Sequence, residues 1–264
     1  MSRITATFAN IKSLAFIPYI MAGDPSAQAT LEIMHGLCDG GADLLELGIP
    51  FSDPTADGIT IQQAGLRALK GGTTLKSVLQ LCGDFRTTNS TTPIILMGYT
   101  NPIMQYGYAQ FAIDAAKSGV DGVIIVDLPP EEEAELQPFL QMNNIDFVRL
   151  IAPTTTGDRL QKLLKNASGF VYNINVKGIT GGLSANDTQL QQRINEIRAL
   201  TSLPVVAGFG IKTPAQVQAL KGIADGVVVG SSLIEAINVA IQSQDANDVA
   251  KLRLFVTEFV QKLK

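Results

Sequence analysis

Eight short apolar segments, separated by longer segments with helical patterning, constrain this chain more than any other feature. Turn residues such as Gly, Pro or Asp follow most of these segments, and apolar residues then recur at helical spacing. The expected strands cover residues 15–21, 44–47, 93–97, 122–126, 147–151, 170–173, 205–207 and 227–229. Strands that are apolar along their whole length are typical of a parallel sheet with helices packed against it.

The helical segments complete a repeated strand–helix pattern. Expected helices cover residues 5–14, 26–38, 60–70, 75–85, 109–117, 131–142, 156–165, 214–221, 232–241 and 249–263. The acidic cluster at 131–133 is expected to complement the N-terminal dipole of its helix. Eight such units in 264 residues predict an α/β fold, a single (βα)8 TIM barrel domain over residues 1–264, with an extra N-terminal helix that caps one end. A doubly wound open sheet is the alternative, but its GxGxxG turn after the first strand is absent.

Composition excludes several classes of function. A net charge of -4 and a pI near 5.1 argue against a nucleic-acid partner. Cys38 and Cys82 lack metal-ligand spacing, which predicts no metal site and a reducing, cytoplasmic location. No apolar run approaches the ~20 residues that span a bilayer, so no membrane association is expected. The only histidine, His35, lies in an expected surface helix, so acid–base chemistry should fall to other side chains.

A barrel selects its functional residues by position, because the chemistry of this fold lies at the carboxyl ends of the strands. The polar residues expected there are Tyr19, Glu46, Asp57, Tyr99, Asp127 and Tyr172. Strand alternation places Glu46 on the face of Leu44, toward the barrel interior. An apolar setting would raise the pKa of Glu46 toward neutrality, so that it could both give and take a proton. Asp57, in a polar loop, is expected to stay ionised and to accept a hydrogen bond from a substrate N–H.

Three Gly-rich corners follow the last strands, at residues 178–181, 208–211 and 230–232. Glycine lets backbone N–H groups approach a ligand closely, and a helix N-terminus favours an anion. Each corner alone could be a simple tight turn. Three on consecutive strands predict a phosphate site.

The stretch LELGIPFSDPTADG, residues 45–58, resembles the catalytic segment of the tryptophan synthase alpha subunit family, and the likeness extends over essentially the whole chain. It implies a lyase of L-tryptophan biosynthesis that cleaves indole-3-glycerol phosphate to indole and glyceraldehyde 3-phosphate. Catalysis would fall to Glu46, as acid and base, and to Asp57, as the partner of the ring N–H. The substrate-binding residues that it implies are Tyr99, Tyr172, Thr180, Gly181, Gly210, Gly230 and Ser231.

The same resemblance implies a partner, a pyridoxal-phosphate beta subunit in an α2β2 heterotetramer, and no cofactor in this chain itself. Residues 50–54 and the region of Asn101 and Pro102 resemble the surface to which the beta subunit binds in that family. Residues 177–186 resemble a lid that closes over the substrate. Met21, Ile59 and residues 173–176 depart from the family pattern, which leaves lid closure and subunit coupling open. The alternatives are a stand-alone lyase that releases indole, a weakly active barrel that mainly activates its partner, and another phosphate-binding barrel enzyme.

Overall fold

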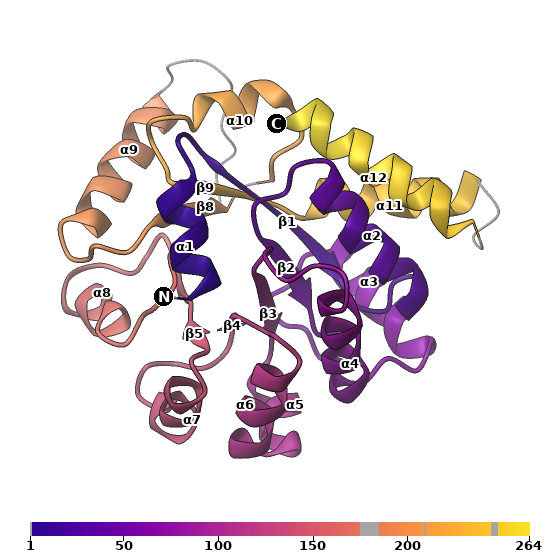
Figure 1. Cartoon of the computed structure of the whole chain (residues 1–264). Helices are drawn as coiled ribbons and strands as arrows, with labels where there is room; N and C mark the ends of the chain where they lie inside the picture. Colours follow the sequence, from indigo (N-terminus) through magenta and orange to yellow (C-terminus); the bar gives the residue numbers. More distant parts are fainter. Residues whose placement is uncertain (1, 175–184, 209, 244–247) are drawn as a thin grey trace.

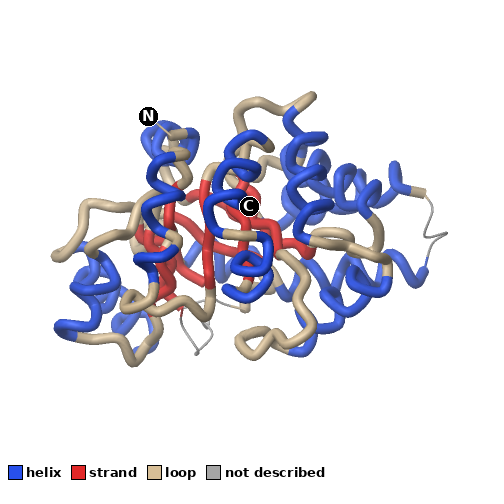
Figure 2. The backbone as a smooth tube through the Cα atoms, turned by 90° about the horizontal axis from the view of Figure 1, so that it is seen from below, coloured by secondary structure: helices blue, strands red, loops and turns tan. Residues whose placement is uncertain are grey.

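A ring of parallel strands surrounded by helices forms the molecule (Figure 1). This computed structural model describes residues 2–174, 185–208, 210–243 and 248–264. Its strands are β1 (Ala15–Met21), β2 (Leu45–Gly48), β3 (Ile94–Gly98), β4 (Gly122–Ile125), β5 (Asp146–Phe147), β6 (Arg149–Ile151), β7 (Val171–Ile174), β8 (Val205–Gly208) and β9 (Gly226–Val229). Figure 2 shows these strands in the middle of the molecule, with helices around them. The expected TIM barrel is confirmed.

The ring closes through one bent strand. The sheet runs in the order β5-β4-β3-β2-β1-β9-β8-β7-β6, so β5 and β6 stand at its two ends. Only Val148 separates β5 from β6, and its N–H donates to the carbonyl of Val123 on β4 at 3.0 Å. The expected strand 147–151 is therefore two short pieces, one paired with β4 and the other with β7.

Twelve α-helices and one 3-10 turn are found among the described residues. They are α1 (Arg3–Asn10), α2 (Ala27–Asp39), α3 (Ile59–Lys70), α4 (Leu75–Arg86), α5 (Thr100–Tyr106), α6 (Tyr108–Lys117), η1 (Glu133–Glu135), α7 (Gln137–Met142), α8 (Gly157–Leu164), α9 (Ala185–Arg198), α10 (Pro214–Ala219), α11 (Ser231–Ser243) and α12 (Val249–Leu263). The sequence reading missed α5 and α9. In α9 the signal was present, because the buried residues Leu190, Ile194 and Ile197 follow helical spacing.

The expected helix over residues 131–142 is wrong in its first half. An α-helix begins only at Gln137, and two of the acidic residues before it bind cations from neighbouring elements. Glu131 pairs with Lys162 of α8 at 2.7 Å, and Glu133 forms a buried ion pair with Arg149 of β6. These partners, rather than the dipole of α7, account for Glu131 and Glu133.

Two apolar layers hold the barrel together. Leu45 and Leu47 belong to the layer between strands and helices, whereas Leu44 belongs to a second layer inside the barrel. Ile4 of α1 is fully buried in that inner layer, so α1 closes the amino-terminal end of the barrel (Figure 1). The capping role expected of an N-terminal helix is confirmed, although the helix spans Arg3–Asn10 rather than residues 5–14.

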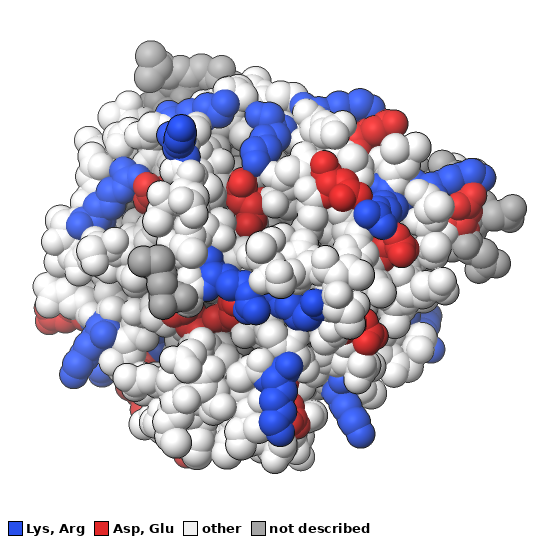
Figure 3. Space-filling model, in the orientation of Figure 1, with Lys and Arg blue, Asp and Glu red and all other residues white. Residues whose placement is uncertain are grey.

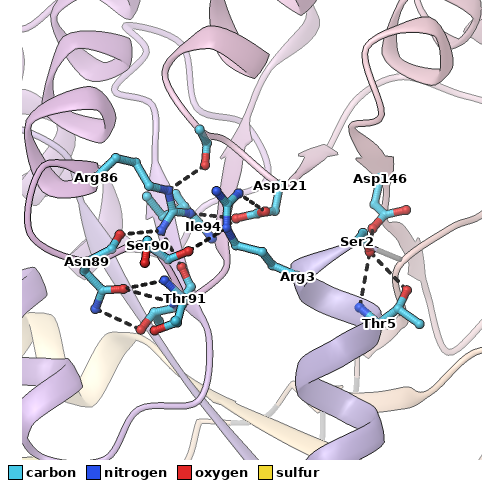
Figure 4. A network of polar contacts seen from close by, with 12 residues as sticks. Ser2, Arg3, Thr5, Arg86, Asn89, Ser90, Thr91, Ile94, Asp121 and Asp146 are labelled. Carbon is cyan, nitrogen blue, oxygen red and sulfur yellow. Dashed lines mark hydrogen bonds and ion pairs between the residues drawn. The ribbon is translucent and has the colours of Figure 1, made fainter.

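Polar contacts fasten this closed end (Figure 4). The buried carboxylate of Asp121, just before β4, accepts hydrogen bonds from Arg3 at 2.8 Å, from Arg86 at 2.7 Å and from the backbone N–H of Ile94 at 2.8 Å. Ser2 donates to Asp146 at 2.8 Å. Elements distant in sequence are thus joined under the barrel.

The surface shows mixed charge on the face that carries α1, where acidic and basic side chains are interspersed (Figure 3). Among the described helices, not one combines the length and the apolar character needed to cross a bilayer.

Candidate active site

A cavity of about 480 Å³ opens at the carboxyl end of the barrel, opposite α1. It contains side chains or backbone from the ends of most strands and from the loop before α3. The lining residues are Tyr19, Glu46, Ala56, Asp57, Gly58, Ile61, Met97, Val126, Leu150, Ala152, Tyr172, Ile174, Gly208, Gly210, Val228, Gly230 and Ser231. The structure thus brings together Glu46, Asp57, Tyr172, Gly210, Gly230 and Ser231.

Glu46 lies inside the barrel, as strand alternation predicts. Its side chain is only 1% exposed, and neither carboxylate oxygen has a hydrogen-bond partner among the described residues. Burial raises the pKa of Glu46 to about 8. A carboxyl group of this kind exchanges a proton near neutral pH, which suits general acid–base chemistry.

Asp57 lies in the loop before α3 and is only half-buried. Burial raises the pKa of Asp57, and the nearby Tyr99 hydroxyl opposes part of that rise. Its setting is therefore less polar than the sequence predicted. The two carboxylates still differ, since Glu46 is fully buried and Asp57 is only half-buried.

Two tyrosines flank the cavity and lie over glycines of neighbouring strands. The Tyr19 hydroxyl occupies the space that a side chain at Gly48 would need, and the Tyr172 ring occupies that space at Gly208. Tyr19 is the register partner of Glu46, so both side chains enter the cavity from the same level of adjacent strands. Burial, followed by the charge of Glu46, raises the pKa of Tyr172 well above its usual range, and the phenol stays neutral.

Two of the three Gly corners, 208–211 and 230–232, contribute residues to the cavity. A Cβ added at Gly210 would meet no atom of the described residues within 4 Å, and α11 begins at Ser231, directly after Gly230, so its N-terminus opens into the cavity. The Ser232 hydroxyl donates to the carbonyl of Ile211 at 2.6 Å and joins the two corners. Free backbone N–H groups at a helix N-terminus favour a phosphate. Thr180, Gly181 and most of the expected lid lie outside the described residues.

Two expected residues lie away from the cavity. Tyr99 is 4% exposed and stands behind the Asp57 loop, where it does not line the cavity. Asp127 is exposed and accepts hydrogen bonds from the N–H and the hydroxyl of Thr100 at 2.7 and 2.8 Å, which caps α5. These hydrogen bonds to the start of α5 therefore explain the position of Asp127.

Sequence reasoning missed the apolar wall of the cavity, which is formed by Ile61, Met97, Val126, Leu150, Ile174 and Val228. Most of these residues stand at carboxyl ends of strands, where the interior-facing register could have identified them.

A larger cavity, of about 750 Å³, lies at the opposite end of the barrel. It is lined by residues of the Asp121 network, whose carboxylates already have partners. Within the described segments, His, Cys, Asp and Glu side chains form no group of three that could hold a metal ion. The partner-free carboxylate and the glycine corners therefore single out the smaller cavity.

Comparison with known proteins agrees with this geometry. The family model described as tryptophan synthase alpha chain matches residues 6–264. The chain is 48% identical over 246 residues to the tryptophan synthase alpha chain of Acidiphilium cryptum (strain JF-5), which covers 92% of this chain and 89% of the relative. A crystal structure of the Legionella pneumophila alpha chain superposes with a TM-score of 0.88 at 39% identity, covering 100% of this chain and 97% of the other.

A chain in the α2β2 tryptophan synthase complex of Pyrococcus furiosus superposes with a TM-score of 0.80 at 36% identity, covering 94% of this chain and 97% of the other. The match to the family model spans nearly the full length, and sequence and structural similarity agree over the same region. This chain belongs to the tryptophan synthase alpha chain family.

Proposed function

We propose that this chain cleaves indole-3-glycerol phosphate to indole and glyceraldehyde 3-phosphate in the cavity at the carboxyl end of the barrel. The observation that carries the proposal is the buried, partner-free carboxyl group of Glu46 in a cavity that also contains Gly210, Gly230 and Ser231. An acid–base group and a phosphate site in one cavity match a substrate with an indole ring at one end and a phosphate at the other.

Glu46 exchanges both protons of this reaction. The protonated carboxyl group gives its proton to the ring carbon that carries the glycerol chain, and the indole becomes a cationic indolenine. The carboxylate then takes the proton of the adjacent hydroxyl group. The carbon–carbon bond breaks, its electrons restore the aromatic ring, and the hydroxyl carbon becomes the aldehyde. A pKa of about 8 suits both transfers near neutral pH.

Asp57 and the glycine corners hold the two ends of the substrate. The Asp57 carboxylate accepts a hydrogen bond from the ring N–H, which becomes more acidic when the ring is protonated, so the interaction is strongest where the charge develops. Gly210, Gly230 and the N-terminus of α11 bind the phosphate. The residues used here carry out the cleavage without a metal or an organic cofactor.

The partner in this proposal is a tryptophan synthase beta subunit, which would hold the pyridoxal phosphate and use the indole. The support is the likeness to the α2β2 complex of Pyrococcus furiosus. Residues 50–54 and the start of α5, near Asn101 and Pro102, form the proposed docking surface beside the cavity. The proposed location is the cytoplasm, where indole would pass between the subunits.

An assay of indole formation from indole-3-glycerol phosphate tests this function. The isolated chain is incubated with the substrate, and a second tube also contains purified beta subunit. We expect slow indole release alone and faster turnover in the complex. High activity alone, unchanged by the beta subunit, would instead favour a stand-alone lyase. No cleavage by either sample would exclude the proposed reaction.

A further inference from the structure

Tyr19 places a phenol hydroxyl group in the active-site cavity, next to Glu46. It lies on β1, is only 7% exposed and lines the cavity. No hydrogen bond joins its hydroxyl group to any of the described residues. A buried hydroxyl group without a hydrogen-bond partner costs free energy, so a ligand that supplies the partner gains from it. This hydroxyl group is therefore available to a substrate.

The position of this hydroxyl group is defined by strand β2. A Cβ atom added at Gly48 would stand 2.2 Å from the Tyr19 hydroxyl oxygen, so the hydroxyl group lies directly over Gly48. Residues two positions apart on a strand share a face, and their Cα atoms are about 6.6 Å apart. Gly48 follows Glu46 by two positions, so the Tyr19 hydroxyl lies on the face of β2 that carries the Glu46 carboxyl group. A small polar group bound between them can contact both.

The opposite end of the Tyr19 side chain lies beside the proposed phosphate site. A Cβ atom added at Gly230 would stand 3.3 Å from the Cβ atom of Tyr19 and 3.4 Å from its Cδ1 atom. The side chain therefore extends from Gly230 on one side to β2 on the other, along the wall of the cavity. A substrate with its phosphate at Gly230 and its indole ring at Glu46 has its glycerol chain beside Tyr19.

We propose that the Tyr19 hydroxyl group binds the glycerol hydroxyl group next to the indole ring and donates a hydrogen bond to its oxygen. The inference rests on the reaction proposed above, in which Glu46 takes the proton of that same glycerol hydroxyl group. An aliphatic hydroxyl group both donates and accepts hydrogen bonds. It donates to the Glu46 carboxylate and accepts from Tyr19, so both protein groups gain a partner that they lack among the described residues.

This hydrogen bond becomes stronger during the reaction. The glycerol oxygen gains negative charge as its proton moves to Glu46, and it becomes the aldehyde oxygen when the carbon–carbon bond breaks. Burial, followed by the charges of Asp57 and Glu46, raises the pKa of Tyr19 well above its usual value, so the phenol keeps its own proton throughout. A fixed neutral donor at an oxygen where charge develops stabilises the transition state more than the bound substrate. Tyr19 therefore accelerates the cleavage as well as binding the substrate.

The first test is the rate of indole formation by the Tyr19→Phe variant, which keeps the ring and loses only the hydroxyl group. In single turnover with indole-3-glycerol phosphate we expect this rate to fall about a hundredfold. Tyr106→Phe is the matched control, because the Tyr106 hydroxyl bonds to Asp114 at 2.9 Å, outside the cavity, and its loss should leave the rate unchanged. A Tyr19→Phe rate close to that of wild type, or an equal loss in the control, would overturn the proposal.

A binding measurement separates contact with the substrate from a change in packing. The probe is a substrate analogue in which hydrogen replaces the hydroxyl group next to the indole ring. Calorimetry gives Kd for this analogue and for indole-3-glycerol phosphate in Glu46→Gln, with and without Tyr19→Phe. Loss of the phenol hydroxyl should raise Kd for indole-3-glycerol phosphate about fivefold and leave Kd for the analogue unchanged. An equal change for both molecules, or no change for either, would contradict the proposal.

The wild-type chain distinguishes failure of this inference from failure of the proposed function. If wild type forms no indole, alone or with beta subunit, the proposed reaction fails and the role of Tyr19 fails with it. If wild type cleaves the substrate but Tyr19→Phe keeps its rate and its Kd, only the role of Tyr19 fails.

Discussion

Each end of the barrel contains a buried carboxylate, and the two carboxylates differ in whether they have hydrogen-bond partners. Asp121 at the amino-terminal end is 5% exposed and is bonded to two guanidinium groups and one backbone N–H. Glu46 at the carboxyl end is 1% exposed and has no hydrogen-bond partner among the described residues. Removing one partner of a paired buried charge is strongly destabilising, whereas an unpaired buried charge is retained at a cost in stability. The carboxylate at the amino-terminal end therefore serves the structure, and the carboxylate at the carboxyl end is available for chemistry.

The largest expected effect is the pH dependence of stability that Glu46 causes. Its pKa is about 8 in the folded chain and 4.5 without burial, so between these values the folded chain binds the extra proton. Stability should therefore decrease as pH rises through this range, by up to about 5 kcal/mol. Urea unfolding of wild type and Glu46→Gln at pH 5 and pH 8.5 measures it. The variant should gain relative stability at the higher pH; a constant difference would show that Glu46 is not desolvated.

Next in size is the effect of Glu46→Gln on the reaction. An amide can neither give nor take the proton, so the rate of indole formation should fall about a thousandfold while the chain stays folded. Single-turnover assays in the complex would measure it. Glu258→Gln, on the exposed side of α12, should keep the wild-type rate. A Glu46→Gln rate within a few-fold of wild type would place the chemistry elsewhere.

Asp121→Asn tests the structural role of the carboxylate at the amino-terminal end of the barrel. Loss of the charge leaves Arg3 and Arg86 without their common partner, and unfolding should become about 3 kcal/mol easier. The rate per folded molecule should be unchanged, because the cavity is at the far end. Denaturant unfolding and kcat measured below the transition temperature check both statements. Asp84→Asn on α4, an exposed carboxylate, should cost no more than about 0.5 kcal/mol.

The smallest effect concerns the phosphate corner. A methyl group at Gly210 would meet no atom of the described residues within 4 Å, so Gly210→Ala should fold normally. The methyl group would enter the space proposed for the phosphate, and KM for the substrate should rise about tenfold with little change in kcat. Gly83→Ala on α4, also in open space, is the control. An unchanged KM for Gly210→Ala would move the phosphate site away from this corner.

Local patterns were enough to predict much of this protein. Apolar runs and helical spacing depend on neighbours a few positions apart, and they predicted the barrel and its capping helix. Strand alternation placed Glu46 inside the barrel, and the Gly corners placed Gly210, Gly230 and Ser231 in the same cavity. The resemblance of residues 45–58 implied the cleavage reaction. Comparison with known proteins confirmed membership of the tryptophan synthase alpha chain family.

Contacts between distant residues needed the folded chain. The hydroxyl of Tyr99 reaches Ala56 across 43 positions, and nothing in the local pattern of either residue indicates that bond. Glu133 was expected at a helix start but pairs with Arg149, and Asp127 was expected at the site but caps α5. Residue type and spacing determine which strand or helix forms and which way a side chain faces. Packing between elements decides which buried charge finds a partner, and so which one remains available for chemistry.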